Sequence, residues 1–163
     1  MTAPAPALSR PSAWDRWQER ISGEGPIARR WTVLAAAAVT LLAAVLRFWN
    51  LGHPDALVFD ETYYVKDAWS QWVLGYAAEW PDADDTNDRF VAGETEIFNA
   101  DDPAFVVHPP LGKLLIGAGM ALFGADSSFG WRFATALAGT ALVLVLFLLA
   151  RTLTASTVFA TVA

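Results

Sequence analysis

The sequence has 163 residues, of which 55% are hydrophobic and 17% are charged, and its formal net charge is -6. It contains no Cys, which excludes thiol catalysis, disulfide bonds and Cys-ligated zinc sites. The apolar residues occur in long runs, which indicates an integral membrane protein and not a soluble domain.

The charges are unevenly placed along the chain. From Asn50 to Pro110 there are thirteen Asp or Glu residues against two Lys or Arg, whereas five Arg and three acidic residues precede Trp31. A basic segment before an apolar run and an acidic segment after it fit the positive-inside rule. The acidic segment also argues against nucleic acid as a partner.

The first expected elements are a tail and a membrane span. We expect a cytoplasmic N-terminal tail over residues 1–28, in which Trp14 and Trp17 mark a short interfacial helix. A transmembrane helix is expected over 29–49, because its apolar run covers roughly 28 Å at the helical rise. A signal peptide is disfavoured, because the basic region is too long and "RFWNLGHPD" offers no small-residue cleavage site.

An outer loop over residues 50–110 follows, and it is expected to carry an amphipathic helix over about 61–79. Asp60 is predicted to cap that helix. Apolar and aromatic residues recur along one helical face, which suits the membrane interface: Val65, Trp69, Trp72 and Tyr76.

Apolar runs after the loop predict further helices. The motif "HPPLGK", stiffened by its two prolines, begins a transmembrane helix expected over 111–128. Another span is expected over 131–150, where Ala residues allow close helix packing. Residues 152–163 read as the start of a further, truncated helix. The sequence therefore predicts the N-terminal part of a longer, all-α integral membrane protein.

Asp60 and Glu61 are the first candidates for chemistry. In the simple interpretation, Asp60 caps a helix and Glu61 is an acid favoured by the helix dipole. In the functional interpretation, a carboxylate is held at the membrane surface as a general base or a metal ligand. The two interpretations are compatible, because a capping Asp is rigidly placed.

The second candidate is "HPPLGK". A Lys in the first turn faces the positive end of the helix dipole, which is unfavourable unless an anion is bound there. A phosphate would be attracted by both the helix N-terminus and Lys113, and His108 could add a hydrogen bond. The alternative is that Lys113 only extends its ammonium to the membrane interface.

Arg47 and Arg132 form the third group of candidates. Arginine within or at the edge of a span is costly and usually has a partner. Arg47 either reaches the interface or pairs with Asp60 or Glu61. Arg132 is either an interface anchor or a functional cation, and its side of the membrane depends on whether 111–128 crosses. His53 and His108 are too isolated to predict a metal site.

The order of these motifs resembles the protein O-mannosyltransferases, which are polyprenyl-phosphate-mannose-dependent glycosyltransferases of the GT-C fold. The resemblance lies in "FDE" with a following Tyr, in "HPPLGKLLI" and in "FGWRFATALAGT", and it covers roughly residues 30–155. The Ala-rich composition is similar to that of actinobacterial members. The resemblance implies a multi-span helical fold in the cell membrane, with the catalytic loop on the extracytoplasmic side.

The resemblance also implies an activity and a set of site residues. The implied reaction transfers mannose from polyprenyl-phosphate-mannose to Ser or Thr hydroxyls of exported proteins, in one inverting displacement. Asp60 matches the base and Glu61 its essential neighbour. Four further residues fall on recurrent positions, and we expect them to bind the donor phosphate: Arg47, His108, Lys113 and Arg132. The fragment alone is expected to be inactive.

The remaining expectations concern cofactors, partners and alternatives. No cofactor is expected with certainty, and a divalent metal stays open. The expected partners are the lipid-linked donor, a Ser/Thr-containing polypeptide and membrane lipid, with the protein export machinery as an open candidate. Two other functions also stay open: a GT-C enzyme for a different lipid-phosphate sugar or acceptor, and a non-enzymatic membrane transport or assembly protein.

Overall fold

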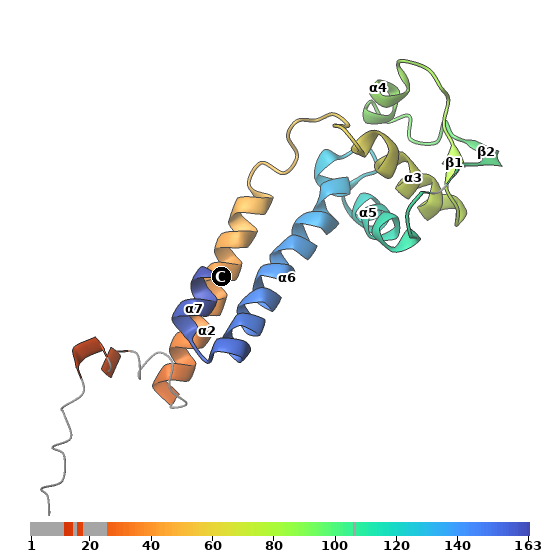
Figure 1. Ribbon diagram of the computed structural model, residues 1–163. Helices are drawn as coiled ribbons and strands as arrows, with labels where there is room; N and C mark the ends of the chain where they lie inside the picture. Colours follow the sequence, from red (N-terminus) through yellow and green to blue (C-terminus); the bar gives the residue numbers. More distant parts are fainter. Residues whose placement is uncertain (1–11, 15, 18–25, 106) are drawn as a thin grey trace, which may run out of the picture. The chain divides into compact units, whose positions relative to one another are not determined.

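The computed structural model describes residues 12–14, 16, 17, 26–105 and 107–163, and these are mostly helical (Figure 1). Most of the predicted tail over 1–28 therefore lies outside the described residues. Of its described part, Trp14 and Trp17 are helical and exposed, with ring centroids 4.9 Å apart.

The chain divides into two compact units. The first unit consists of the residues up to Ala43 together with Ala141–Ala163, and the second unit consists of Ala44–Thr140. Every candidate site residue predicted from the sequence belongs to the second unit. The fold of the second unit therefore determines which of these residues lie close together.

Two helices are long and apolar enough to cross a membrane: α2 (Pro26–Phe48) and α6 (Ser128–Thr154). They include most of the predicted span over 29–49 and all of the predicted span over 131–150. Ala and Leu dominate both helices and are among the best helix formers. Many of their apolar side chains are exposed, Leu41, Leu46 and Leu148 among them. Such surfaces need lipid or other helices to cover them, and the chain is accordingly a membrane protein.

Helix α5 (Pro110–Phe123) is shorter than the span predicted over 111–128. It ends because Gly124 takes a positive φ of 109° and donates its N–H to the Met120 carbonyl. The next helix begins only at Ser128, so residues 111–128 do not form one continuous helix. A second membrane crossing by this segment stays a prediction.

Helix α3 (Glu61–Leu74) also ends earlier than predicted, at Leu74 and not near Glu79. Gly75 stops it, because this residue adopts the left-handed conformation with φ 86° and donates its N–H to the Gln71 carbonyl. The chain then enters strand β1 (Ala78–Glu79), which pairs antiparallel and irregularly with β2 (Asn99–Pro103).

The predicted aromatic stripe is not one surface in the structure. Val65 is buried in the core of the second unit, and Trp69 packs against that core. Trp72 is exposed on α3, whereas Tyr76 lies beyond the helix and donates its hydroxyl to the Ala100 carbonyl. Val65, Trp69 and Trp72 are helical as predicted, but the first two pack inward and the helix ends before Tyr76.

The core of the second unit joins α3, α5, α6 and the short helix α4 (Thr86–Val91). Its buried members are Val65, Ala68, Phe90, Met120 and Trp131. The helices approach closely where glycines meet. A Cβ added to Gly119 would lie 2.4 Å from the Gly130 carbonyl oxygen, so only glycine fits there.

The first unit ends in helix α7 (Thr157–Val162). The sequence predicted one truncated helix over 152–163, whereas the structure continues α6 to Thr154 and then breaks. The break is at Ala155, which has φ 53°, and Ser156 then caps α7 by accepting the Phe159 N–H. Within this unit, Phe147 packs with Ala150 and Ala160.

The glycine contact between α5 and α6 gives a test of this packing. Gly119→Ala should lower the free energy of unfolding by about 1–3 kcal/mol, because the new methyl group meets backbone and not a movable side chain. Gly112→Ala on the same helix meets nothing within 4 Å and should be neutral or stabilising by about 0.5 kcal/mol. Thermal unfolding in detergent micelles measures both variants, and equal midpoints would contradict the close helix contact.

Candidate functional site

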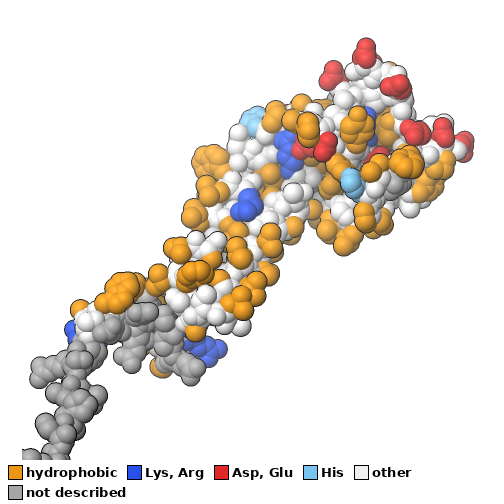
Figure 2. All heavy atoms as spheres, viewed as in Figure 1, with side chains coloured by type: hydrophobic (Ala, Val, Ile, Leu, Met, Phe, Trp, Pro, Cys, Tyr) orange, Lys and Arg blue, Asp and Glu red, His pale blue; other side chains and the backbone are white. Residues whose placement is uncertain are grey.

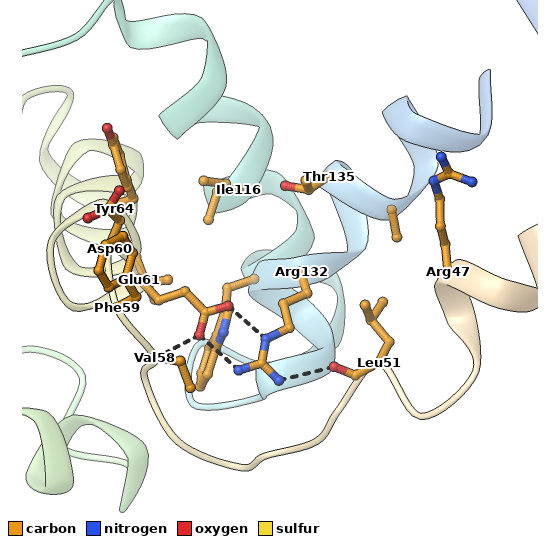
Figure 3. Close-up of a pocket in the computed structure, with 13 residues that line it drawn as sticks. Arg47, Leu51, Val58, Phe59, Asp60, Glu61, Tyr64, Ile116, Arg132 and Thr135 are labelled. Carbon is orange, nitrogen blue, oxygen red and sulfur yellow. Dashed lines mark hydrogen bonds and ion pairs between the residues drawn. The ribbon is translucent and has the colours of Figure 1, made fainter. Parts of the chain in front are cut away.

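Two open cavities in the second unit meet at the beginning of α3. The first, which we call the arginine pocket, has a volume of about 500 Å³ and is lined by Arg47, Arg132, Asp60 and Glu61 among apolar side chains (Figure 3). The second, which we call the acidic pocket, has a volume of about 390 Å³ and is lined by several carboxylates and aromatic rings. The two cavities share Asp60 and Tyr64.

Asp60 occupies the N-cap position of α3, but its side chain does not cap the helix. Glu61 and Thr62 hold the helix start instead. The Glu61 Oε2 accepts the Val58 N–H at 3.0 Å, and the Thr62 hydroxyl donates to the Phe59 carbonyl at 2.8 Å. The prediction of a capping Asp60 is therefore wrong. The Asp60 carboxylate is exposed and makes no hydrogen bond to any of the described residues.

Arg132 anchors the chain around Asp60. Its Nε donates to Glu61 Oε1 at 2.7 Å and its Nη2 donates to Glu61 Oε2 at 2.8 Å (Figure 3). The other three N–H groups reach the carbonyl oxygens of Leu51, Pro54 and Ala56 at 2.9 to 3.1 Å. A guanidinium has five N–H donors, and all five are used here. Arg132 thus ties the loop before α3 to α6.

The ionisation of Glu61 reflects this arrangement. Burial raises the pKa of its carboxyl, but the hydrogen bonds from Arg132 and Val58 and the charge of Arg132 together outweigh burial. The pKa of Glu61 is therefore held below its ordinary value, and this carboxylate stays ionised. An ionised carboxylate with both oxygens occupied is suited to holding the loop, not to accepting a proton.

Lys113 lies in the acidic pocket, apart from both arginines. Its Nζ is 2.7 Å from Asp67 Oδ2, and its side chain is only 3% exposed. A Lys in the first turn of a helix is near the positive end of the helix dipole, so an anion is expected beside it. Within this chain that anion is the carboxylate of Asp67, which α3 supplies.

His108 is placed in the same pocket by the extended segment before α5. Its ring stacks on Tyr64 with centroids 5.5 Å apart and an interplanar angle of 30°. Both rings belong to the lining of the acidic pocket. The four residues expected to bind phosphate are thus divided, with Arg47 and Arg132 in one cavity and His108 and Lys113 in the other.

Arg47 reaches the arginine pocket from the last turn of α2 (Figure 3). Its neighbour Phe48 packs edge-on against Phe133, with ring centroids 5.7 Å apart. The Arg47 side chain runs across Gly139 of α6, where an added Cβ would lie 2.7 Å from Arg47 Nε. The arginine that pairs with Glu61 is Arg132.

Tyr64 and Asp67 are among the residues lining the two pockets that were not predicted for the site from the sequence. Asp60, Tyr64 and Asp67 follow one another at i, i+4 and i+7, a spacing that places them on one face of a helix. That signal was present in the sequence. Among the residues the structure describes, no group of three or more His, Asp or Glu is placed to hold a metal ion.

Comparison with known proteins gives one family. Residues 107–163 match the family model described as dolichyl-phosphate-mannose-protein mannosyltransferase. The chain is 36% identical over 144 residues to the polyprenol-phosphate-mannose–protein mannosyltransferase of Mycobacterium tuberculosis. This alignment covers 85% of the chain and 23% of the relative, so the chain spans about a quarter of that protein's length.

Two further relatives are more distant. The enzyme of the same name from Corynebacterium glutamicum is 32% identical over 78% of the chain and 23% of its own length. Protein O-mannosyl-transferase 1 of Rattus norvegicus is 31% identical over 61% of the chain and 10% of its own length. No solved structure matches the chain significantly.

The depressed pKa of Glu61 predicts how stability depends on pH. Because the folded pKa lies below the unfolded value of about 4.3, the pair with Arg132 contributes fully above that pH. Its contribution is lost as the pH falls through the folded pKa. Glu61→Gln should therefore lower the unfolding midpoint at pH 7 and flatten its decline between about pH 5 and pH 3.

Glu94→Gln is the matched control for this measurement. Glu94 pairs with Arg89 at 2.6 Å, but both side chains are more exposed than those of Glu61 and Arg132. Exposed pairs contribute little to stability. The control should keep the wild-type pH profile, and identical profiles for Glu61→Gln and Glu94→Gln would contradict the anchoring role of Arg132.

Proposed function

The chain belongs to this family of protein mannosyltransferases, and on that premise we propose that the whole protein transfers mannose from polyprenyl-phosphate-mannose to Ser or Thr hydroxyls of polypeptides. The observation that carries the proposal for this site is the exposed Asp60 carboxylate, which makes no hydrogen bond to the described residues and lines both the arginine pocket and the acidic pocket. We infer the identity of the sugar, mannose, and of the lipid carrier, a polyprenyl phosphate, from the name of the similar mycobacterial protein.

Asp60 is the proposed base. The acceptor oxygen attacks the anomeric carbon and the bond from that carbon to the phosphate oxygen breaks. The electron pair leaves with the phosphate, and the hydroxyl proton passes to Asp60. A carboxylate is a weak base for a hydroxyl, but the hydroxyl becomes acidic as its new bond to carbon forms. A single displacement of this kind inverts the anomeric centre.

The arginine pocket is the proposed donor site. Its lining is mostly apolar, from Leu51, Val58 and Ile116 among others, and suits a polyprenyl chain. A cation beside the leaving phosphate stabilises the charge that develops on it. Arg47 is the residue we assign to this role.

Arg132 and Lys113 receive different roles from those expected on the sequence. All five N–H groups of Arg132 bond within the chain, so it fixes Glu61 and the loop and does not bind phosphate. Lys113 is buried against Asp67 and holds α5 to α3. We assign both as positioning residues, which keep Asp60 between the two pockets.

The membrane topology follows from the same proposal. Arg29 and Arg30 lie near the beginning of α2, and by the positive-inside rule we assign that end of the helix to the cytoplasmic side. The other end of α2 leads into the second unit, with its exposed acidic residues. The site then lies on the extracytoplasmic side of a multi-pass protein, where the lipid-linked donor and exported polypeptides meet.

Asp60→Asn should abolish mannosyl transfer by the whole protein, with at least about a hundredfold loss, since general base catalysis contributes about that much or more. The unfolding midpoint should not change, because the Asp60 side chain makes no hydrogen bond to the part of the chain that the structure describes. Transfer is measured with a radiolabelled lipid-linked mannose and a Thr-containing peptide. Asp82→Asn, at an exposed acid outside both pockets, is the control, and normal transfer by Asp60→Asn would remove the base assignment.

Gly139→Ala tests the donor role of Arg47 without altering the arginine itself. The new methyl group would force the flexible end of the Arg47 side chain to move, at little cost to stability. We expect a several-fold higher KM for the donor, an unchanged KM for the acceptor peptide, and the same but larger effect from Arg47→Ala. Ala138→Val, at an exposed neighbouring position, is the control. A rise in both KM values would contradict a role specific to phosphate.

A further inference from the structure

The acidic pocket adjoins the arginine pocket at Asp60 and Tyr64, which belong to both linings. In an inverting displacement the attacking hydroxyl and the leaving phosphate are on opposite faces of the anomeric carbon. If the phosphate occupies the arginine pocket, the acidic pocket, which Asp60 also lines, is the adjoining cavity left for the acceptor hydroxyl. This inference rests on the proposed function.

The lining of the acidic pocket has an uneven charge. It contains three carboxylates, those of Asp60, Asp67 and Glu79, against one cation, Lys113. The ammonium of Lys113 is fixed 2.7 Å from Asp67 and neutralises that carboxylate. Asp60 and Glu79, both exposed, are left as negative charges facing the cavity.

The pocket also offers apolar contact surfaces. Tyr63 and Phe105 are 71% and 85% exposed, although both are large and aromatic. Exposed aromatic rings next to carboxylates suit a side chain with an apolar stem and a cationic head, because the stem packs on the ring and the cation is attracted by both groups.

The surroundings of the pocket carry the same sign of charge. Figure 2 shows acidic side chains gathered over the part of the second unit that holds α4 and the two strands. Besides Glu79, the exposed acids in these segments and the turns beside them are Asp82, Asp84, Asp85, Asp88, Glu94, Glu96, Asp101 and Asp102. Such a field raises the local concentration of cationic segments and repels acidic ones.

We propose that the acidic pocket receives the acceptor polypeptide and selects segments that carry Lys or Arg within a few residues of the Ser or Thr hydroxyl. Glu79 is the specificity-determining residue, because it is a carboxylate of the lining that neither accepts the proton nor pairs with Lys113. Polypeptides with Asp or Glu at the same distance are disfavoured.

The test uses three peptides that differ only at the two residues flanking a single Thr, which are Lys, Gln or Glu. The whole protein, in nanodiscs, is assayed for mannosyl transfer from polyprenyl-phosphate-mannose to each peptide. The values of kcat/KM should fall in the order Lys, Gln, Glu, with a ratio of roughly tenfold between the extremes at low salt and a smaller ratio at high salt. Equal values, or a preference for the Glu peptide, would overturn the proposal.

Two variants locate the preference. Glu79→Gln should reduce the ratio between the Lys and Glu peptides at least about threefold, whereas Glu96→Gln, at an exposed acid outside the pocket lining, should preserve it. An unchanged ratio in Glu79→Gln, or the same reduction in both variants, would assign the preference to the general field and overturn the role of the pocket.

Binding of the same peptides, labelled with a fluorophore, separates this proposal from the proposed function. If no peptide accepts mannose, the transferase proposal fails, but the pocket still predicts tighter binding of the Lys peptide and its weakening by Glu79→Gln. Equal affinities of the three peptides would overturn the selectivity whether or not transfer is observed.

Discussion

The saturated guanidinium of Arg132 is the interaction on which the second unit depends. It gathers two oxygens of Glu61 and three backbone carbonyls of the preceding loop onto one helix, α6. A buried or half-buried charge is costly unless each of its polar groups is paired, and here each one is. The interaction fixes the loop and the first residue of α3, and so determines where the neighbouring carboxylate of Asp60 points.

A second ion pair acts on the same helix two turns further along. Lys113 of α5 holds Asp67, so α3 is bound to α6 near its beginning and to α5 near its middle. Asp60 immediately precedes the first anchor, and its carboxylate makes no hydrogen bond to the described residues. The paired residues Arg132, Glu61, Lys113 and Asp67 thus fix the helices, whereas Asp60 keeps its carboxylate accessible. A preorganised site needs both kinds of residue. Ion pairs of this kind contribute little net stability compared with apolar packing, but they restrict the helix to one position.

Local patterns in the sequence predicted the helices and the membrane character, because apolar runs of 20 residues leave few alternatives. The ends of several helices were not predicted correctly. These helices stop at single residues with a positive φ, Gly75, Gly124 and Ala155, and the spacing of apolar residues carries no information on backbone conformation. The residues predicted for the site all line one of two adjoining cavities, but their pairing could not be predicted, because Arg47 and Arg132 are equivalent in sequence arguments. Only the fold shows that Glu61 lies beside Arg132, and that Asp67 faces Lys113.

The 14 residues of α5 matter for the surrounding lipid. A helix of this length measures about 21 Å, against about 30 Å for the hydrocarbon core of a bilayer. If α5 crosses the bilayer, the lipid around its exposed Leu111, Leu115 and Leu122 thins locally to match its length. Because Ile116 of the same helix lines the arginine pocket, such thinning would bring headgroups and water nearer to that pocket.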